Sequence, residues 1–255
     1  MKKIIYIIIL LFSFAFFTHH KLAILANLGV AEAQYSLANE YFEGRNGHVE
    51  RKKALDWCKR AAINGNPNAQ YRMGEEEENE LLEGNSKNAF EWFYKAASQG
   101  HADAMIKIGE MYNTGTGVIK DEAKAVDFFL KAIAQYETAA NSGDAAAASK
   151  LGDIFGEGHI IAKDPNQAFK WEKKAANMGK SYCQLRLAHY FETGEGTNVN
   201  LLEAYKWYSL AAVNAQDELC GEVARTDRDR IEKLLSPEQI ITARELARNW
   251  QPSND

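Results

Sequence analysis

The sequence predicts an all-α fold, an α/α solenoid of about five stacked helix pairs, from a repeated pattern and its spacing. A twelve-residue pattern begins with Ala, carries Trp three residues later and ends after a pair of alanines, with copies starting at Ala54, Ala89, Ala168 and Ala204. A looser copy with Phe in place of Trp starts at Ala125. The starts lie 35, 36, 43 and 36 residues apart. A period of this size is typical of helical repeat proteins, whose units stack on their neighbours.

Each unit is predicted to contain two helices separated by a Gly-containing loop. In residues 30–65, Leu37 and Tyr41 recur at a four-residue step on one face of a first helix. Gly44 is expected to end that helix, because glycine adopts the left-handed backbone that closes many helices. A second helix then carries the Trp and the two alanines. The same pattern predicts four further units, at 66–100, 101–143, 144–179 and 180–215.

Two units depart from this pattern. Unit 3 holds seven extra residues. Because seven residues make two helical turns, its second helix is predicted to be longer without any rotation of its apolar face. Unit 2 has Glu77 where the other units have Tyr or Phe, and ENELLEGN replaces its Gly-rich loop. Its first helix, opened by Asn66 as N-cap and Pro67, is therefore predicted to be poorly packed at its end or shortened.

The two ends of the chain differ from the repeats. Lys2 and Lys3 precede an apolar run from Ile4 to Phe17, which predicts a signal peptide over 1–26 with cleavage after Ala26. An uncleaved anchor is the alternative. At the other end, residues 216–255 are predicted to form capping helices that cover the open end of the solenoid. The last of these begins with a capping box made by Ser236 and Gln239, with Pro237 at the first helical position.

Composition limits the function classes. The 255 residues carry a formal net charge of −5, and cleavage after Ala26 would remove three lysines and leave −8. A mildly acidic protein is a poor candidate for nucleic-acid binding. The three cysteines, Cys58, Cys183 and Cys220, are too few for a disulfide scaffold and have no zinc-site spacing. A bridge between Cys183 and Cys220 is not favoured, because neighbouring helices pack ~8–10 Å apart and a disulfide joins Cα atoms ~4.4–6.8 Å apart.

The repeated residues resemble a known family. AEAQYSLANEYFEG followed by KKALDWCKRAAING, from Ala31 and Lys52, is similar to the Sel1-like repeat, a relative of the tetratricopeptide repeat. The resemblance covers about residues 30–215. It implies an α/α solenoid that acts as a scaffold or adaptor. Exported bacterial members resemble regulators of surface complexes, host-directed factors and immunity proteins against lipase toxins of type VI secretion.

Several patterns with chemical potential have structural interpretations. TGTG at 114–117 and TGEG at 193–196 follow no predicted strand and recur as repeat loops, so they do not indicate a nucleotide site. The consecutive acidic residues of EEEENE at 75–80 point around a helix axis instead of converging on a cation. No G-x-S-x-G nucleophile motif is present. The sequence therefore predicts no catalytic residues, no metal and no cofactor. The tryptophans of the repeated pattern, which we call the Trp column, are expected to pack in the core: Trp57, Trp92, Trp171 and Trp207.

One set of positions is a candidate partner-binding site on the concave face, where the first helices lie. An apolar column in units 3 to 5 could grip a protein segment. A basic column and a mostly acidic column run beside it; neutralisation of one by the other is the alternative interpretation. The apolar residues are Met111, Ile154 and Tyr190, the basic ones Lys107, Lys150 and Arg186, and the third column is Glu110, Asp153 and His189.

These observations predict an exported, periplasmic or secreted, non-catalytic protein that binds a protein partner through the concave face. One alternative is a periplasmic immunity protein that neutralises a type VI secretion lipase effector. The other is an enzyme, such as a cell-wall hydrolase or a β-lactamase-like protein. Contact with a membrane is expected only through the N-terminal segment, if that segment is not cleaved.

Overall fold

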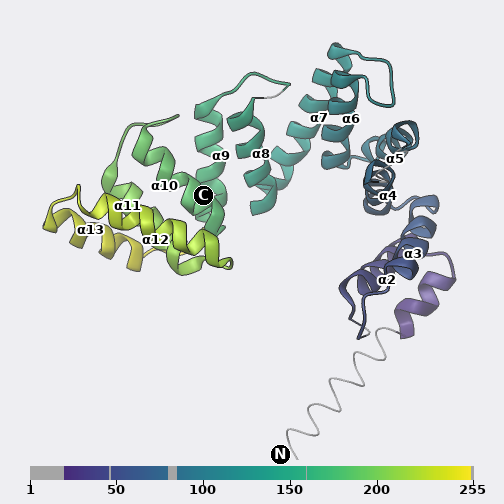
Figure 1. The fold of residues 1–255 in the computed structure, drawn as a ribbon, viewed down its shortest axis with the longest axis horizontal. Coiled ribbons are helices and arrows are strands. Elements are labelled where there is room, and N and C mark those ends of the chain that lie inside the picture. The colour runs from purple at the N-terminus through teal and green to yellow at the C-terminus, as the bar shows by residue number, and fades with distance from the viewer. Residues whose placement is uncertain (1–19, 46, 80–84, 159, 254–255) are drawn as a thin grey trace, which may run out of the picture. The chain divides into compact units, whose positions relative to one another are not determined.

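The computed structural model describes residues 20–45, 47–79, 85–158 and 160–253. All regular elements in these ranges are helices, which confirms the predicted all-α class (Figure 1). The predicted apolar run from Ile4 to Phe17 lies outside the described residues. Among the residues that are described, no helix combines the length and the apolar character needed to cross a membrane. The chain divides into two compact units, Met1–Ala132 and Ile133–Asp255.

The compact unit Met1–Ala132 contains helix pairs, in which first and second helices alternate along the chain. Each first helix packs on the second helix of its own pair. The second helices of the first two pairs also pack on the first helix of the next pair. A short helical stretch, residues 20–27, precedes them. The helices are α2 (Ala31–Glu43), α3 (Arg51–Ile63), α4 (Pro67–Asn79), α5 (Ser86–Ser98), α6 (Ala102–Thr114) and the first part of α7 (Glu122–Asn141).

The compact unit Ile133–Asp255 has the same alternation of first and second helices and ends in two further helices. It contains the last part of α7, then α8 (Ala145–Glu157), α9 (Pro165–Asn177), α10 (Ser181–Thr193), α11 (Leu201–Asn214), α12 (Glu218–Glu232) and α13 (Pro237–Arg248). Both α12 and α13 pack on α11 (Figure 1). Trp250, beyond α13, meets Trp207 of α11 edge to face at 6.1 Å, and the Ser253 amide donates to the Asn177 carbonyl at 2.9 Å.

The departures predicted in units 2 and 3 have mixed outcomes. α7 has 20 residues where the other second helices have 13 or 14, as the seven-residue insertion predicts. α4 is as long as α2, with 13 residues each, so the prediction of a shortened helix is wrong. The Asn66 side chain caps α4 by accepting from the Ala69 amide at 2.8 Å. The half-buried carboxylate of Glu77 accepts from Asn88 Nδ2 at 3.4 Å, so α5 gives it a polar partner where other units have an aromatic ring.

The tryptophans are divided between core and surface. Trp171 and Trp207 are 3% exposed, as a structural Trp column predicts. Trp57 and Trp92 are half-buried. The Arg60 guanidinium lies 4.6 Å from the ring centroid of Trp57, and the Lys95 ammonium lies 4.3 Å from that of Trp92. Cations at these distances are attracted to the ring face, so a charged side chain covers part of each half-buried ring.

The position directly after each Trp forms the centre of each helix pair. Across five pairs it is buried, and in three of them it packs against a glycine of the first helix. A Cβ on Gly74 would lie 2.5 Å from the Phe93 ring, and one on Gly109 would lie 2.4 Å from the Phe129 ring. The glycines therefore allow a large side chain between the helices. The five residues are Cys58, Phe93, Phe129, Glu172 and Tyr208.

All three cysteines are free thiols, in agreement with the expectation that a bridge is not favoured. Cys58 and Cys183 are buried and Cys220 is partly exposed. Burial raises the pKa of Cys58 to about 11 and that of Cys183 to about 12. At neutral pH both are neutral thiols with little nucleophilic character. The predicted capping box of α13 is also present, with the Gln239 amide donating to Ser236 Oγ and the Ser236 amide donating to Gln239 Oε1.

Candidate functional site

Six of the nine predicted site residues lie on α8 and α10, in the compact unit Ile133–Asp255. α8 is capped by Asp144, whose side chain accepts from two amides of the first turn, and it ends at Gly158, which has a φ of 70°. α10 ends in the same way at Gly194, with a φ of 77°. These left-handed glycines turn the chain into the loops that follow α8 and α10. A pocket of about 220 Å³ lies there, lined by Gly156, Glu157, Lys163, Arg186, His189, Tyr190 and Glu195.

Arg186 is the polar centre of this pocket. Its Nη1 donates to Asp153 Oδ1 and forms an ion pair at 3.0 Å with Glu172 Oε1. Its Nη2 and the Tyr190 hydroxyl each lie 3.5 Å from the place that a Cβ on Gly156 would occupy. Arg186 therefore joins α8, α9 and α10 with one nitrogen and turns the other toward the pocket. At the pocket rim, Lys163 and Glu195 form an ion pair at 2.6 Å.

Glu172 is unusual for its position. It is completely buried, at the place where other pairs have Cys, Phe or Tyr. Neither of its carboxylate oxygens accepts a hydrogen bond from the described residues. The pKa of the Glu172 carboxyl is raised to about 7, chiefly by burial and to a smaller extent by Asp153, while Arg186 and Cys183 act to lower it. A buried carboxylate with so few partners costs stability, so packing alone does not explain its presence.

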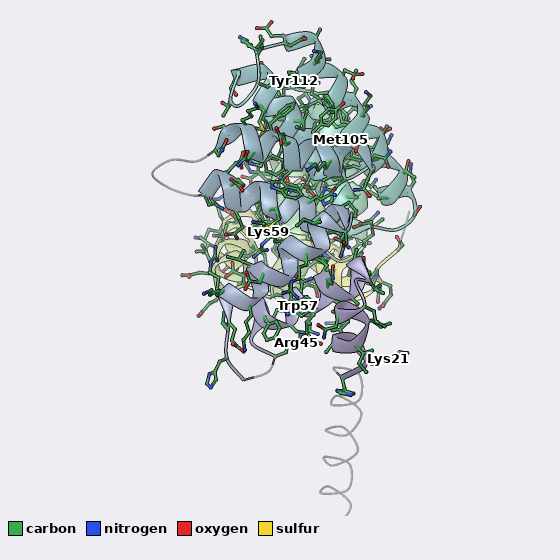
Figure 2. All side chains as sticks on the ribbon, turned by 90° about the vertical axis from the view of Figure 1, so that its right-hand side faces the viewer. Lys21, Arg45, Trp57, Lys59, Met105 and Tyr112 are labelled. Carbon is green, nitrogen blue, oxygen red and sulfur yellow. The ribbon has the colours of Figure 1, made fainter. Side chains whose placement is uncertain are left out.

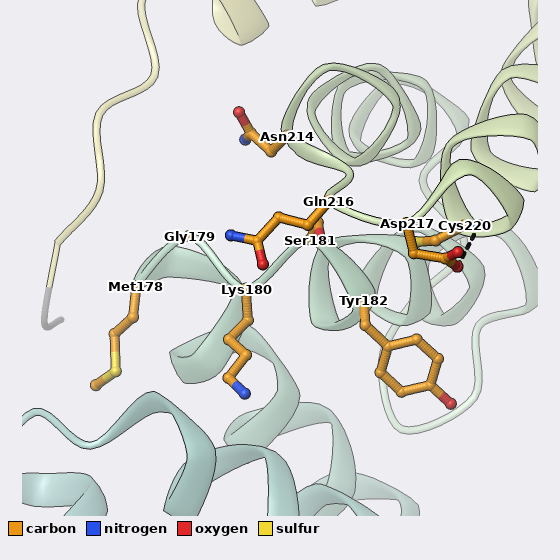
Figure 3. Close-up of a pocket in the computed structure, with 9 residues that line it drawn as sticks. All are labelled: Met178, Gly179, Lys180, Ser181, Tyr182, Asn214, Gln216, Asp217 and Cys220. Atoms are coloured by element: carbon orange, nitrogen blue, oxygen red, sulfur yellow. Dashed lines mark hydrogen bonds between the residues drawn. The ribbon is translucent and has the colours of Figure 1, made fainter. Parts of the chain in front are cut away.

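A second pocket lies at the other end of α10 and has a volume of about 480 Å³. Figure 3 shows its lining, which includes Lys180, Tyr182 and Cys220 beside the turn that follows α11. Tyr182 is 55% exposed, and the centroid of its ring lies 5.7 Å from the Arg186 guanidinium. Tyr182, Arg186 and His189 are spaced four and three residues apart, so they share one face of α10 over ~10 Å. We call these three residues the α10 stripe.

The structure corrects the predicted apolar column. Met111 and Tyr190 are 3% and 8% exposed, so neither presents a side chain that a partner could grip, and Ile154 is half-buried. Each lies three residues after a core residue of its own helix, and residues three apart share a helix face. The Tyr190 ring packs edge to face on Phe169 of α9, 6.1 Å away.

Two residues of the basic column form ion pairs with carboxylates of the preceding first helix. Lys107 of α6 lies 3.0 Å from Glu78 of α4, as Arg186 pairs with Asp153. Glu110, Lys150 and His189 are exposed. The alternative interpretation, neutralisation of one column by the other, therefore describes the pair of Arg186 with Asp153, whereas Glu78 belongs to neither column. No cluster of His, Cys, Asp and Glu with metal-binding potential occurs within the described ranges.

Two functional candidates were missed by the sequence reasoning. Tyr182 occupies a first-helix position that holds Glu32, Asn68, Asp103 and Ala146 in the other units. Glu172 occupies the apolar centre of its pair. In both cases the available signal was a residue out of character with its column, which alignment of the five repeats by position would have shown.

Comparison with known proteins places the chain in a family. The Sel1 repeat matches residues 31–66, 67–101, 102–137, 145–180 and 181–212, each stretch starting one residue after a predicted unit. The chain belongs to the Sel1 repeat family. Sel1 repeat proteins generally mediate protein–protein interactions and are generally not catalytic.

Solved Sel1 proteins share the fold. A Sel1 repeat protein from Oxalobacter formigenes matches with a TM-score of 0.56 and 27% identity over 85% of this chain and 84% of that one. A protective antigen of uropathogenic Escherichia coli strains matches with a TM-score of 0.52 and 25% identity over 92% of this chain. The match spans only 56% of the antigen.

One curated relative matches over a shorter stretch. The chitin synthase regulator SKT5 of Saccharomyces cerevisiae is 36% identical over 62 residues, which are 24% of this chain and 9% of that protein. The match spans a small part of the regulator, so the similarity concerns the repeats and not the regulator as a whole.

Proposed function

We propose that this Sel1 repeat protein is an exported, non-catalytic scaffold that binds a protein partner along the α10 stripe. The observation that carries the proposal is the buried Glu172 beneath Arg186. A solenoid core is most stable with an apolar side chain at this place, so a carboxylate there is best explained by what it does to Arg186. It holds the guanidinium beside the pocket in a fixed orientation.

The exposed part of the stripe has the composition of a binding hot spot. Tyr and Arg are enriched among the residues that dominate binding energy at protein interfaces. Tyr182 and His189 are exposed, and Arg186 between them is half-buried and held by ion pairs. A pocket lies at each end of α10. We propose that a partner segment lies along α10 and inserts side chains at both ends.

Site-specific photo-crosslinking tests this proposal in the full-length protein. A photoreactive amino acid at Tyr182 or His189 is expected to capture one and the same partner from the envelope fraction. The matched control is Lys173, which is exposed on α9 of the same unit. Equal capture from Lys173, or different proteins captured from Tyr182 and His189, would contradict binding along the stripe.

The location and the narrower partner hypotheses stay predictions. Export rests on the N-terminal Lys2, Lys3 and the apolar run that follows them. Recovery of the protein from the cytosol with Met1 intact would contradict it. The immunity hypothesis is a special case of the same binding mode, and a lipase among the proteins captured at Tyr182 would select it. A hydrolase activity that survives in a variant lacking the stripe would instead favour the enzyme alternative.

A further inference from the structure

The residues just before the first repeat form the end of a further second helix. In units 1 to 4, the second helix ends with two backbone hydrogen bonds around a left-handed glycine. At residues 65 and 66, the Gly65 amide donates to the Ala62 carbonyl at 3.1 Å and the Asn66 amide donates to the Ala61 carbonyl at 2.9 Å. The same pair of bonds recurs after α5, α7 and α9, at Gly100, Gly143 and Gly179.

This turn is present once more, upstream of unit 1. The Gly29 amide donates to the Ala26 carbonyl at 3.1 Å and the Val30 amide donates to the Leu25 carbonyl at 3.1 Å. Gly29 has a φ of 87°, and the four equivalent glycines have φ values of 91° to 98°. Residues 20–29 therefore have the backbone of a repeat's second helix, although the helix pair to which it would belong is not complete.

A side-chain contact marks the same equivalence. Near the start of α4, Gln70 Nε2 donates to the Ala62 carbonyl at 3.0 Å, and in α10 Gln184 Nε2 donates to the Ala176 carbonyl at 3.3 Å. In α2, Gln34 Nε2 donates to the Ala26 carbonyl at 2.9 Å. In each case a buried glutamine joins a first helix to the end of the preceding second helix. Ala26 is thus the positional equivalent of Ala62 and Ala176.

Residues 20–29 also cover apolar surface of the first complete pair. Ala26 is completely buried in a cluster with Ala33 and Leu37, and Leu22, Leu25, Tyr41 and Trp57 pack against it. Figure 2 shows Trp57 at the same end of the compact unit Met1–Ala132 as Lys21. The terminal pair of a solenoid needs such a cover, because its outer face has no neighbour. Removal of residues 1–26 would expose this cluster and leave the buried Gln34 amide without its acceptor.

We infer that residues 20–29 remain on the mature protein as an N-terminal half-repeat, and, resting on the export proposed above, that a leader is removed upstream of them, at the Ala15–Phe16 bond. Hydrolysis of that bond by water leaves the Ala15 carboxylate on the leader and a new amine on Phe16. Ser13 and Ala15 supply the small residues three places and one place before the bond, and Ile4 to Phe12 supplies an apolar region of nine residues. Cleavage after Ala26 would instead divide the half-repeat.

Processing is tested with a matched pair of variants of the full-length protein. Ala15→Arg changes the residue just before the proposed bond, and Ile24→Arg changes the residue three places before the Ala26–Asn27 bond. Ile24 is 49% exposed, so the fold is expected to tolerate arginine there. Mass spectrometry of the envelope protein is expected to show Phe16 as the first residue in wild type and Ile24→Arg, and intact precursor in Ala15→Arg. A chain that starts at Asn27, or one that keeps Met1, overturns the cleavage position.

A second pair of variants tests the half-repeat directly. Ala26→Asp places a charge in the buried cluster, and Asn27→Asp places the same charge on the exposed neighbour. The melting midpoint of the purified envelope protein is expected to fall by about 10 °C for Ala26→Asp and to change little for Asn27→Asp. If Ala26→Asp fails to fold, the milder Ala26→Ser is expected to give a smaller fall. A melt of Ala26→Asp identical to wild type would show that residue 26 is absent from the folded protein, and would overturn the inference.

Discussion

Repeats 2 and 4 have the same central packing geometry and fill it with opposite chemistry. In repeat 2, Gly74 leaves room for the Phe93 ring, and the Lys107 ammonium lies 6.0 Å from the ring centroid. In repeat 4, Gly152 leaves room for the Glu172 carboxylate, and a Cβ there would lie 2.3 Å from Oε1. Arg186, the positional equivalent of Lys107, pairs with that carboxylate at 3.0 Å. The comparison separates what the repeat needs for folding from what repeat 4 adds.

The first lesson of the comparison concerns cost. A phenylalanine at this position contributes buried apolar surface and needs no polar partner. A buried glutamate needs a cation or hydrogen-bond donors. Glu172 has one ion pair, and its oxygens accept no hydrogen bond within the described residues. Replacement of buried ion pairs by apolar residues of similar volume is often neutral or stabilising. Repeat 4 therefore gives up stability that repeat 2 keeps, and the pocket at Arg186 is where the loss can be useful.

The largest expected effect comes from moving the acid into repeat 2. Phe93→Glu removes a completely buried ring and places a carboxylate near Lys107, which is already paired with Glu78. The free energy of unfolding is expected to fall by about 5 kcal/mol, because the loss of the buried ring and the burial of a charge both destabilise the folded state. Urea denaturation of the full-length protein measures this. Phe93→Leu is the control and should cost much less; an equally small loss for Phe93→Glu would mean that the Lys107 position alone makes an acid acceptable.

A smaller effect follows from the protonation of Glu172. Burial raises the pKa of its carboxyl to about 7, above its ordinary 4.5, so the folded protein binds this proton more tightly than the unfolded chain. The contribution to stability is then largest below pH 4.5 and is lost as pH rises toward 7. Between pH 5 and 8 the loss is on the order of 2 kcal/mol, since one pKa unit corresponds to ~1.4 kcal/mol.

The measurement is the difference between wild type and Glu172→Gln across this pH range. The subtraction removes other titrating groups, for example Glu192, whose carboxyl pKa is lowered by the hydrogen bond from Arg230. The groups that face Glu172 are Arg186 and Cys183 of α10 and Asp153 of α8, and all are unchanged in the variant. Glu172→Gln is expected to gain on wild type as pH rises. A difference that stays constant from pH 5 to 8 would show that Glu172 remains ionised throughout.

Conversion of repeat 4 to the chemistry of repeat 2 should stabilise the protein. Glu172→Phe recreates the glycine–phenylalanine packing of Gly74 with Phe93, and Arg186 keeps its contact with Asp153. The free energy of unfolding at pH 7.5 is expected to rise by about 1–4 kcal/mol. Photo-crosslinking from His189 is expected to weaken in the same variant, because Arg186 loses its buried anchor. A variant that is more stable and still captures the partner fully would separate Glu172 from binding.

The sequence was sufficient for the repeat architecture and insufficient for the site. The Ala, Trp and Gly positions recur at fixed spacing, and each is imposed by helix contact or helix ending, so the helix boundaries and the longer α7 could be predicted. The site depends on differences between repeats. An apolar column in units 3 to 5 predicts an open groove at Met111 and Tyr190, whereas the three-residue step from Ile108 and Leu187 places both against the core.

The half-repeat could not be predicted for a related reason. Residues 20–29 lack the Trp that marks the other second helices, since Lys21 stands in its place. Their identity is carried by backbone hydrogen bonds at Gly29 and by the contact between Gln34 and Ala26. An apolar stretch that follows the apolar run from Ile4 to Phe17 also looks like the continuation of that run. The packing of Leu22 and Leu25 against Ala33 and Leu37 of α2 also separates residues 20–29 from that run.

The smallest effect is expected for the hydroxyl group of Tyr190. Tyr190→Phe keeps the ring on Phe169 and removes the oxygen beside Arg186 and Gly156. Burial raises the pKa of this hydroxyl, so the lost group is a neutral one, and the change in unfolding free energy is expected to be about 1 kcal/mol or less. Tyr190→Ala is the contrasting variant, because it removes a buried ring and should cost several times more. The pair thus distinguishes the two parts of one side chain: if the partner contacts the oxygen, crosslinking from His189 falls in Tyr190→Phe while the melt is nearly unchanged. If Tyr190→Phe captures the partner as well as wild type, the oxygen is not a contact, and binding at this end of α10 depends on Arg186 and His189.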